Sequence, residues 1–129
     1  MKMPTEMECK IRKELIKVAK DRKFIKYGEL ADRVNYLYEC HFGADEKEFH
    51  DMLGNISKYE YQSNPPRPLL SVIVVTKNPV TGNLLPGHGF FTLARELGKQ
   101  NPDVDDDTFA MQEMKELFEY WQNNDDPDR

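Results

Sequence analysis

Residues 69–98 constrain the fold of this chain more than any other stretch. The stretch opens with an apolar run whose β-branched residues, between positions 72 and 76, favour a buried strand. Residues 78–83 contain an Asn-Pro and a Gly-Asn pair, which mark a turn, and Leu84-Leu85 can return along the first strand. The stretch therefore predicts a β-hairpin with one buried strand.

A compact corner follows the predicted hairpin. Pro86-Gly87-His88-Gly89 exposes its backbone immediately before a short predicted helix over residues 90–97, which Gly98 ends. A plain hairpin rarely needs such a corner before its helix. If the chain has a functional site, we expect it at this corner first.

Length and composition favour one domain. The chain has 129 residues, of which 39% are hydrophobic and 32% charged, as is typical of a globular protein with a single modest core. We assign the domain to residues 1–121 and expect a disordered acidic tail over 122–129. No apolar run is long enough to span a membrane, and the first residues do not resemble a signal peptide. Cys9 and Cys40 lack the spacing of a metal site or a disulfide framework, so we expect a cytoplasmic protein with two structural thiols.

The net charge of −5 conceals two oppositely charged ends. Residues 1–26 carry nine basic and four acidic residues, a balance of +5, and residues 99–129 carry three basic and ten acidic residues, a balance of −7. Such asymmetry is typical either of a polyanion-binding face with an acidic appendage or of two solvated helix faces. We expect the C-terminal helix to pack beside the N-terminal helix and mask part of its charge.

Four stretches carry apolar residues at helical spacing. The first begins at Thr5, which forms a capping-box motif with Glu8, and the last follows the acidic run over residues 103–107. Three prolines between positions 65 and 68 end the third helix. The four apolar stripes are Ile11, Leu15, Val18 and Ala19; Leu30, Val34, Leu37 and Tyr38; Phe49, Leu53, Ile56 and Tyr59; and Met111, Met114, Leu117, Phe118 and Trp121.

Three helices followed by a β-hairpin is the order of a winged helix-turn-helix protein. Tyr27-Gly28-Glu29-Leu30-Ala31 resembles the start of the helix-turn-helix in alkylguanine-DNA alkyltransferases and alkyltransferase-like proteins. The resemblance covers about residues 8–98 and continues, in the family's order, through Leu53-Gly54, Asn64-Pro65, the strand over 70–75, the glycine-rich turn over 82–89 and the helix over 93–98. It implies an α+β fold of winged helix-turn-helix type, to which this chain adds a C-terminal helix.

The resemblance does not extend to the alkyl acceptor. Leu70-Ser71-Val72-Ile73 stands where the family has Pro-Cys-His-Arg, in which the cysteine is a nucleophile activated by its histidine. Ser71 has no base beside it in the sequence, so we expect no alkyltransferase activity. The loop over residues 39–48 is also longer than the family's turn, and Lys26 replaces a capping threonine.

The third predicted helix and its exit carry residues suited to nucleic acid. Asparagine reads base edges, lysine and arginine hold phosphates, and tyrosine stacks on unpaired bases. The candidates are Lys47, Asn55, Lys58, Tyr61, Asn64 and Arg67. Four acids weaken this interpretation because they would repel phosphates: Glu46, Glu48, Asp51 and Glu60.

The corner supplies a second candidate site, formed by Ser71, Gly87, His88 and Gly89. His88 could reach a ligand there, and the flanking N–H groups could bind a small anion. The alternative is a turn in which the glycines adopt positive φ angles and His88 is merely exposed. Ser71 would be a nucleophile only if His88 served as its base, and a core serine is the simpler interpretation. The histidines lack metal-ligand spacing, so no metal is expected.

Three functions are compatible with these patterns. The first is a small non-enzymatic protein that binds nucleic acid through its helix-turn-helix and needs no cofactor. The second is a protein-interaction module that has lost contact with DNA and binds a protein partner, or forms a homodimer, through its amphipathic C-terminal helix. The third is an enzyme that acts on a small anionic substrate at the corner over residues 86–89. No pattern indicates a membrane partner.

Overall fold

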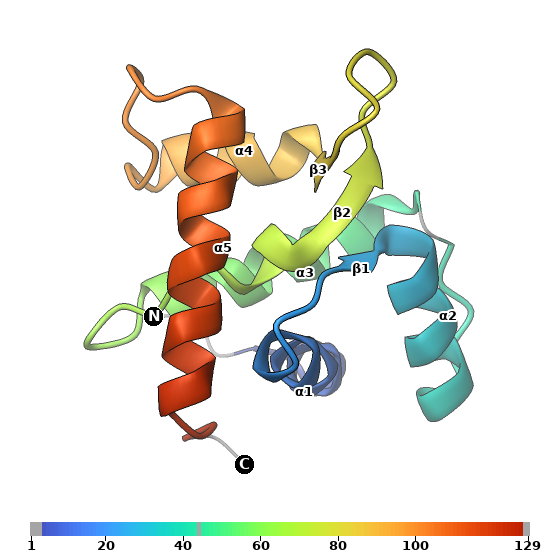
Figure 1. The fold of residues 1–129 in the computed structure, drawn as a ribbon. Helices are drawn as coiled ribbons and strands as arrows, with labels where there is room; N and C mark the ends of the chain where they lie inside the picture. The colour runs from blue at the N-terminus through green and yellow to red at the C-terminus, as the bar shows by residue number, and fades with distance from the viewer. Residues whose placement is uncertain (1–3, 44, 128–129) are drawn as a thin grey trace.

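The computed structural model describes residues 4–43 and 45–127 and has an α+β fold (Figure 1). Within these residues, five α-helices are combined with a three-stranded sheet and a short 3-10 helix, η1. The elements in chain order are α1 (Glu6–Lys20), β1 (Ile25–Lys26), α2 (Tyr27–Tyr38), α3 (Lys47–Tyr61), η1 (Leu70–Ile73), β2 (Val74–Lys77), β3 (Leu84–Pro86), α4 (His88–Glu96) and α5 (Asp106–Asn123).

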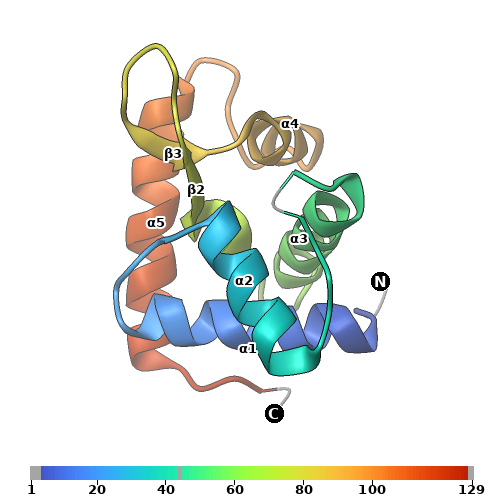
Figure 2. The ribbon, with the colours of Figure 1, turned by 90° about the vertical axis from the view of Figure 1, so that its right-hand side faces the viewer.

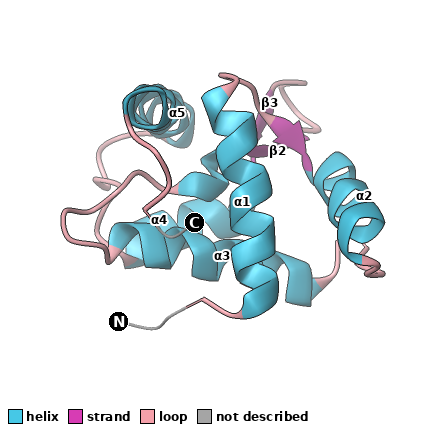
Figure 3. Cartoon of the chain, turned by 90° about the horizontal axis from the view of Figure 1, so that it is seen from below, coloured by secondary structure: helices cyan, strands magenta, loops and turns pink. Residues whose placement is uncertain are grey.

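Helix α1 begins as the sequence predicts and packs along one side of the fold. Thr5 Oγ1 accepts a hydrogen bond of 3.1 Å from the Glu8 backbone N–H, and Glu8 Oε1 accepts one of 2.8 Å from the Thr5 N–H. These two bonds confirm the capping box. The predicted apolar stripe is buried, and α2, α3, α5 and η1 all pack against the helix. Figure 3 shows α1 between α5 and α2.

The sheet has the order β1-β2-β3 and mixes two strand directions. β2 and β3 form the predicted antiparallel hairpin, in which Thr76 lies opposite Leu85. Along its other edge, β2 pairs in parallel with β1, and Ile25 lies opposite Val74. The short strand β1 immediately precedes α2, so this pairing fixes where α2 begins relative to the hairpin.

The predicted buried strand begins two residues later than expected. Leu70–Ile73 form the 3-10 helix η1, and only Val74–Lys77 are extended. All four residues of η1 are buried. A short apolar run that is buried on every side lacks the alternation that distinguishes a strand from a helix, so the sequence pattern could not separate the two.

The predicted corner at residues 86–89 does not precede the helix as a separate element, because α4 already begins at His88. Gly87 is the N-cap of this helix, and His88 and Gly89 belong to its first turn. Neither Gly87 nor Gly89 has a positive φ, so the interpretation that these glycines supply one is wrong. Gly98, in contrast, follows α4 with a φ of +75° and ends it as predicted.

Helix α5 packs against α1 and η1, as the charge pattern predicts (Figure 1). Leu117 and Trp121 are fully buried, whereas Met111 is 69% exposed. The Asp105 side chain caps the helix by accepting a hydrogen bond of 2.8 Å from the Thr108 N–H. Most of the apolar stripe of α5 is therefore used to close the protein's own core.

The expected disordered tail is corrected for residues 122–126. Helix α5 continues to Asn123, and the chain then runs along the outside of α1 (Figure 2). Arg12 Nη1 donates a hydrogen bond of 2.8 Å to Asp126 Oδ1, and the Asp126 side chain is only 10% exposed. Lys20 Nζ lies 3.3 Å from Asp125 Oδ1. The last two residues, 128–129, lie outside the described part of the chain.

A buried ion cluster connects α1, α3, the proline-rich segment and this tail. Arg12 donates to both carboxylate oxygens of Glu60, at 3.1 and 3.2 Å, and Arg67 donates to the same carboxylate at 2.9 Å. Glu60 is fully buried, and the two arginines are 3% and 7% exposed. Burial alone would lower the pKa of Arg12, but Glu60 and Asp126 raise it well above its ordinary value, so the guanidinium stays charged.

Replacing Glu60 by glutamine should lower the free energy of unfolding by about 3–5 kcal/mol, because Arg12 and Arg67 would lose their shared carboxylate. Urea unfolding followed by circular dichroism measures the change. The control is Glu119→Gln at an exposed position of α5, for which we expect a change within about 0.5 kcal/mol. Equal losses in the two variants would contradict a structural role for the cluster.

Replacing Asp126 by asparagine should lower the free energy of unfolding by about 1–3 kcal/mol, because buried Arg12 loses one of its two carboxylates. Asp125→Asn is the matched control, since its partner Lys20 is partly exposed and such pairs contribute about 0–1 kcal/mol. Thermal unfolding of both variants compares them directly. A larger loss in Asp125→Asn would show that the tail is held in another way.

Candidate functional site

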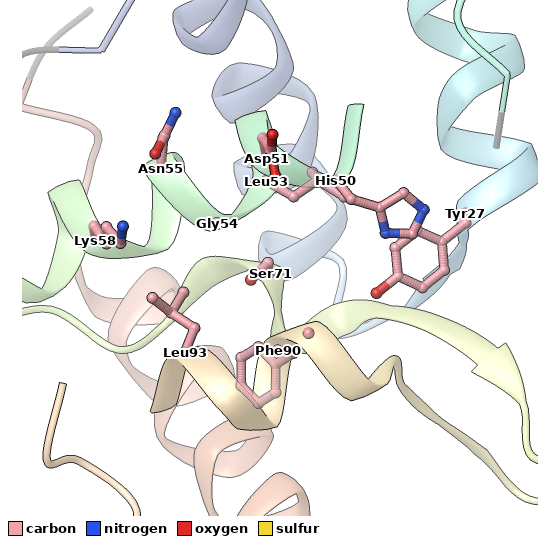
Figure 4. Close-up of a pocket in the computed structure, with 11 residues that line it drawn as sticks. Tyr27, His50, Asp51, Leu53, Gly54, Asn55, Lys58, Ser71, Phe90 and Leu93 are labelled. Atoms are coloured by element: carbon pink, nitrogen blue, oxygen red, sulfur yellow. The ribbon is translucent and has the colours of Figure 1, made fainter. Parts of the chain in front are cut away.

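A cavity of about 400 Å³ opens between α3 and α4 (Figure 4). Ser71 of η1 lines it, and Tyr27, the first residue of α2, lies at one end. A volume of this size is in the range of ordinary small-molecule sites. The polar residues that line the cavity are Tyr27, His50, Asp51, Asn55, Lys58 and Ser71, and the apolar ones are Leu53, Phe90 and Leu93.

Two glycines keep this space open. Gly54 of α3 and Gly89 of α4 both line the cavity and contribute no side chain to it. A Cβ at Gly54 would lie 3.9 Å from Leu93 Cδ2, and a Cβ at Gly89 would meet nothing within 4 Å beyond its own helix. Both are helical positions without a positive φ, which other residues could occupy. The hollow therefore arises from missing side chains rather than from backbone strain.

A pair of serine hydroxyls lies beneath the cavity. The oxygens of Ser57 and Ser71 are 2.6 Å apart, and Ser57 Oγ also accepts a hydrogen bond of 3.0 Å from the Ser71 N–H. Ser71 lines the cavity and Ser57 does not. Since a buried hydroxyl needs an acceptor, the satisfied arrangement has Ser57 donating to Ser71. In that arrangement the Ser71 hydroxyl is left to donate a hydrogen bond into the cavity that Ser71 lines.

An aromatic pair forms one wall of the cavity. The rings of Tyr27 and His50 are stacked, with centroids 4.7 Å apart and planes inclined by 19° (Figure 4). The Tyr27 hydroxyl accepts a hydrogen bond of 3.2 Å from the Gly87 N–H. A Cβ at Gly87 would lie 3.1 Å from that hydroxyl, so the close approach favours glycine there. Burial raises the pKa of Tyr27, which keeps the phenol neutral at physiological pH.

Two side chains from the exposed face of α3 form the rim opposite this wall. Asn55 Nδ2 donates a hydrogen bond of 2.9 Å to Glu8 Oε2, which holds the amide in one orientation. Lys58 is exposed, and its ammonium forms no ion pair with any of the described residues. Figure 4 shows the Asn55 amide on the side of α3 away from Ser71 and Phe90, so the rim group with an unpaired charge is Lys58.

The structure brings together residues from both predicted sites. Asn55 and Lys58, predicted to bind nucleic acid, share the cavity with Ser71 and Gly89 of the predicted corner. His88 lines a different cavity, beside the hairpin. The hydroxyl partner of Ser71 is Ser57 rather than a base, so the Ser71–His88 arrangement considered from the sequence does not form.

The remaining candidates lie outside the cavity. Lys47 pairs with Asp51 at 2.7 Å, and Arg67 belongs to the buried ion cluster. Tyr61 is half-buried with Lys99 Nζ 5.9 Å from its ring centroid, and Asn64 is exposed beside a cis proline. Since Glu60 neutralises Arg67 in the core, we omit Arg67 from the site. Tyr27 and His50 were not assigned to a site from the sequence. The Tyr27-Gly28 motif could have pointed to Tyr27.

Several properties bear on the class of site. No group of three or more His, Cys, Asp or Glu residues within 4–43 and 45–127 is placed to hold a metal ion. In the same part of the chain, no helix has both the length and the apolar character needed to cross a membrane. Comparison with protein-family models, with curated proteins and with solved structures finds no match to the chain.

Replacing Ser57 by alanine should lower the free energy of unfolding by about 1–3 kcal/mol, because the buried Ser71 N–H loses its acceptor. Ser71→Ala retains the bond from the backbone N–H at position 71 to Ser57 but leaves the fully buried Ser57 hydroxyl without its acceptor, so it should also cost about 1–3 kcal/mol. Urea unfolding of both variants provides the comparison. A negligible loss in Ser71→Ala would contradict the hydrogen-bond arrangement deduced for this pair, in which Ser71 is the acceptor for Ser57.

Proposed function

We propose that this protein binds nucleic acid without catalysing a reaction and takes one unstacked base into the cavity between α3 and α4. The cavity supports this because it combines an aromatic wall, a hydroxyl donor and a lysine at its rim. Pockets that receive extruded bases use stacking on aromatic side chains and hydrogen bonds to the base edge. Tyr27 and His50 suit the first role, and Ser71 suits the second.

The order of the elements supports a winged-helix interpretation of this proposal. Helices α1, α2 and α3 precede the β2–β3 hairpin, which corresponds to the wing. In this interpretation α3 is the recognition helix, and its exposed face carries Asn55 and Lys58 to the nucleic acid. The parallel strand β1 departs from a simple wing. It places Tyr27 at the end of the cavity, because α2 begins directly after β1.

The acids of α3 oppose phosphate binding less than the sequence suggests. Glu60 is buried and neutralised by two arginines, and Asp51 is paired with Lys47. Glu46 and Glu48 lie at the N-terminal end of α3, roughly three turns from Lys58. The face near Lys58 therefore carries less negative charge than four acids would give it.

The same cavity argues against alkyl transfer. Ser71 stands at the position aligned with the family's acceptor cysteine, and its hydroxyl is bonded to Ser57. A serine hydroxyl becomes a useful nucleophile only when an adjacent base removes its proton, and Ser57 is not a base. We therefore assign Ser71 the role of a hydrogen-bond donor and propose that a bound base leaves the protein unmodified.

Two variants test the proposal with labelled DNA duplexes, one perfectly paired and one containing a single bulged nucleotide. The parent protein should prefer the bulged duplex. Gly89→Leu should remove that preference by weakening binding to the bulged duplex about tenfold, because the leucine side chain fills the cavity and excludes the base. Lys58→Ala should weaken binding to both duplexes and lower the salt slope by about one, because a phosphate contact is lost. Fluorescence anisotropy over a range of salt concentrations measures all of these effects.

Lys115→Ala, at an exposed position of α5, is the control for the loss of a positive charge and should leave the salt slope unchanged. The proposal fails if the parent protein does not distinguish the two duplexes. It also fails if Gly89→Leu folds normally and keeps the preference for the bulged duplex.

A further inference from the structure

A second cavity, of about 540 Å³, adjoins the first at the Tyr27–His50 pair. Tyr27 and His50 line both cavities. The second cavity lies between the start of α2 and strand β2, and Gly28 and Val75 contribute to its lining. An aromatic pair with a cavity at each side can offer stacking surface to two flat groups at once.

Lysines lie at both ends of this pair of cavities. Lys58 is at the rim of the first, and Lys26 and Lys77 line the second from neighbouring strands. None of these three ammonium groups forms an ion pair with residues in the described ranges. The acids Glu29 and Asp45 also line the second cavity, and Glu29 is engaged as an acceptor for the Lys26 backbone N–H at 3.3 Å. Lysines therefore flank the aromatic surface on both sides, and because two acids balance the two lysines of the second cavity, a polyanion with flat side groups would meet most of its positive charge at Lys58.

We propose that the two cavities together bind a short single strand of nucleic acid, with one base in each cavity and the Tyr27–His50 pair between them. Lys58 would hold a phosphate at one end of the strand, and Lys26 and Lys77 would hold a phosphate at the other. This inference rests on the proposed function and specifies its ligand. A duplex keeps successive bases stacked and paired, whereas a single strand can splay two bases into separate cavities.

Two glycine positions allow the cavities to be filled one at a time. Gly28 lines the second cavity and Gly89 the first, and a Cβ at either would meet nothing within 4 Å beyond its own helix. Both are helical, and leucine has a higher helix propensity than glycine, so Gly28→Leu and Gly89→Leu should both fold. Gln112→Leu adds the same side chain at an exposed position of α5 and is the control.

The measurements are fluorescence anisotropy with labelled hexathymidylate and with the duplex that contains one bulged nucleotide. The parent protein should bind hexathymidylate more tightly than the perfect duplex. Gly28→Leu should weaken hexathymidylate binding about tenfold, the effect of one lost stacking contact, and should leave the bulged duplex unaffected. Gly89→Leu should weaken both, and Gln112→Leu should weaken neither. Circular dichroism melts confirm that each variant is folded.

The possible outcomes separate this inference from the function on which it rests. If Gly89→Leu weakens binding but Gly28→Leu does not, the second cavity is not a subsite and only the single-base function survives. If the perfect duplex binds more tightly than hexathymidylate, the single-strand inference is overturned. If neither variant changes binding to either ligand, both the inference and the proposed function are wrong.

Discussion

The carboxylate of Glu60 is the point on which the rest of the structure depends. A fully buried negative charge must be paired, and Arg12 and Arg67 supply the pairing from α1 and from the segment after the prolines. Asp126 then completes the pairing of Arg12. At 100° per residue, Asp51 lies on the side of α3 opposite Glu60, and Asn55 and Lys58 lie within about 40° of that opposite side. The buried ion cluster therefore also determines which face of α3 is turned away from the core.

The helices that bury one face could be predicted from the sequence. The stripes beginning at Ile11 and Phe49 have helical spacing and are buried as predicted. Leu70–Ile73 and the two-residue strand β1 could not be predicted, because neither is long enough to show a period. The tail was misjudged for a different reason. Its composition is that of a solvated segment, and only the position of Arg12 in the folded protein gives Asp126 a buried partner.

The sequence predicted parts of the site but not that they lie together, because its residues come from four separate elements. Asn55 and Lys58 were assigned from the chemistry of α3, and Ser71 and Gly89 from the corner, with no sequence signal that joined the two sets. Arg67 and Glu60 were both interpreted as surface charges, although they bind each other in the core. Glu60 could have been recognised as buried, since it follows Ile56 by four residues and so continues the apolar stripe of α3. The Tyr27–His50 contact joins residues that no local pattern relates.

The two glycines that line the cavity put helix stability and open space in opposition. Glycine inside a helix costs about 0.5–1 kcal/mol relative to alanine, so α3 and α4 are weaker than they need to be at Gly54 and Gly89. Space at Gly89 is open, which makes it a position where almost any substitution would be accommodated. Selection of this chain for heat resistance alone would therefore favour replacements at Gly89. Such a lineage would gain a firmer α4, and a large replacement such as leucine would occupy part of the cavity in one mutational step.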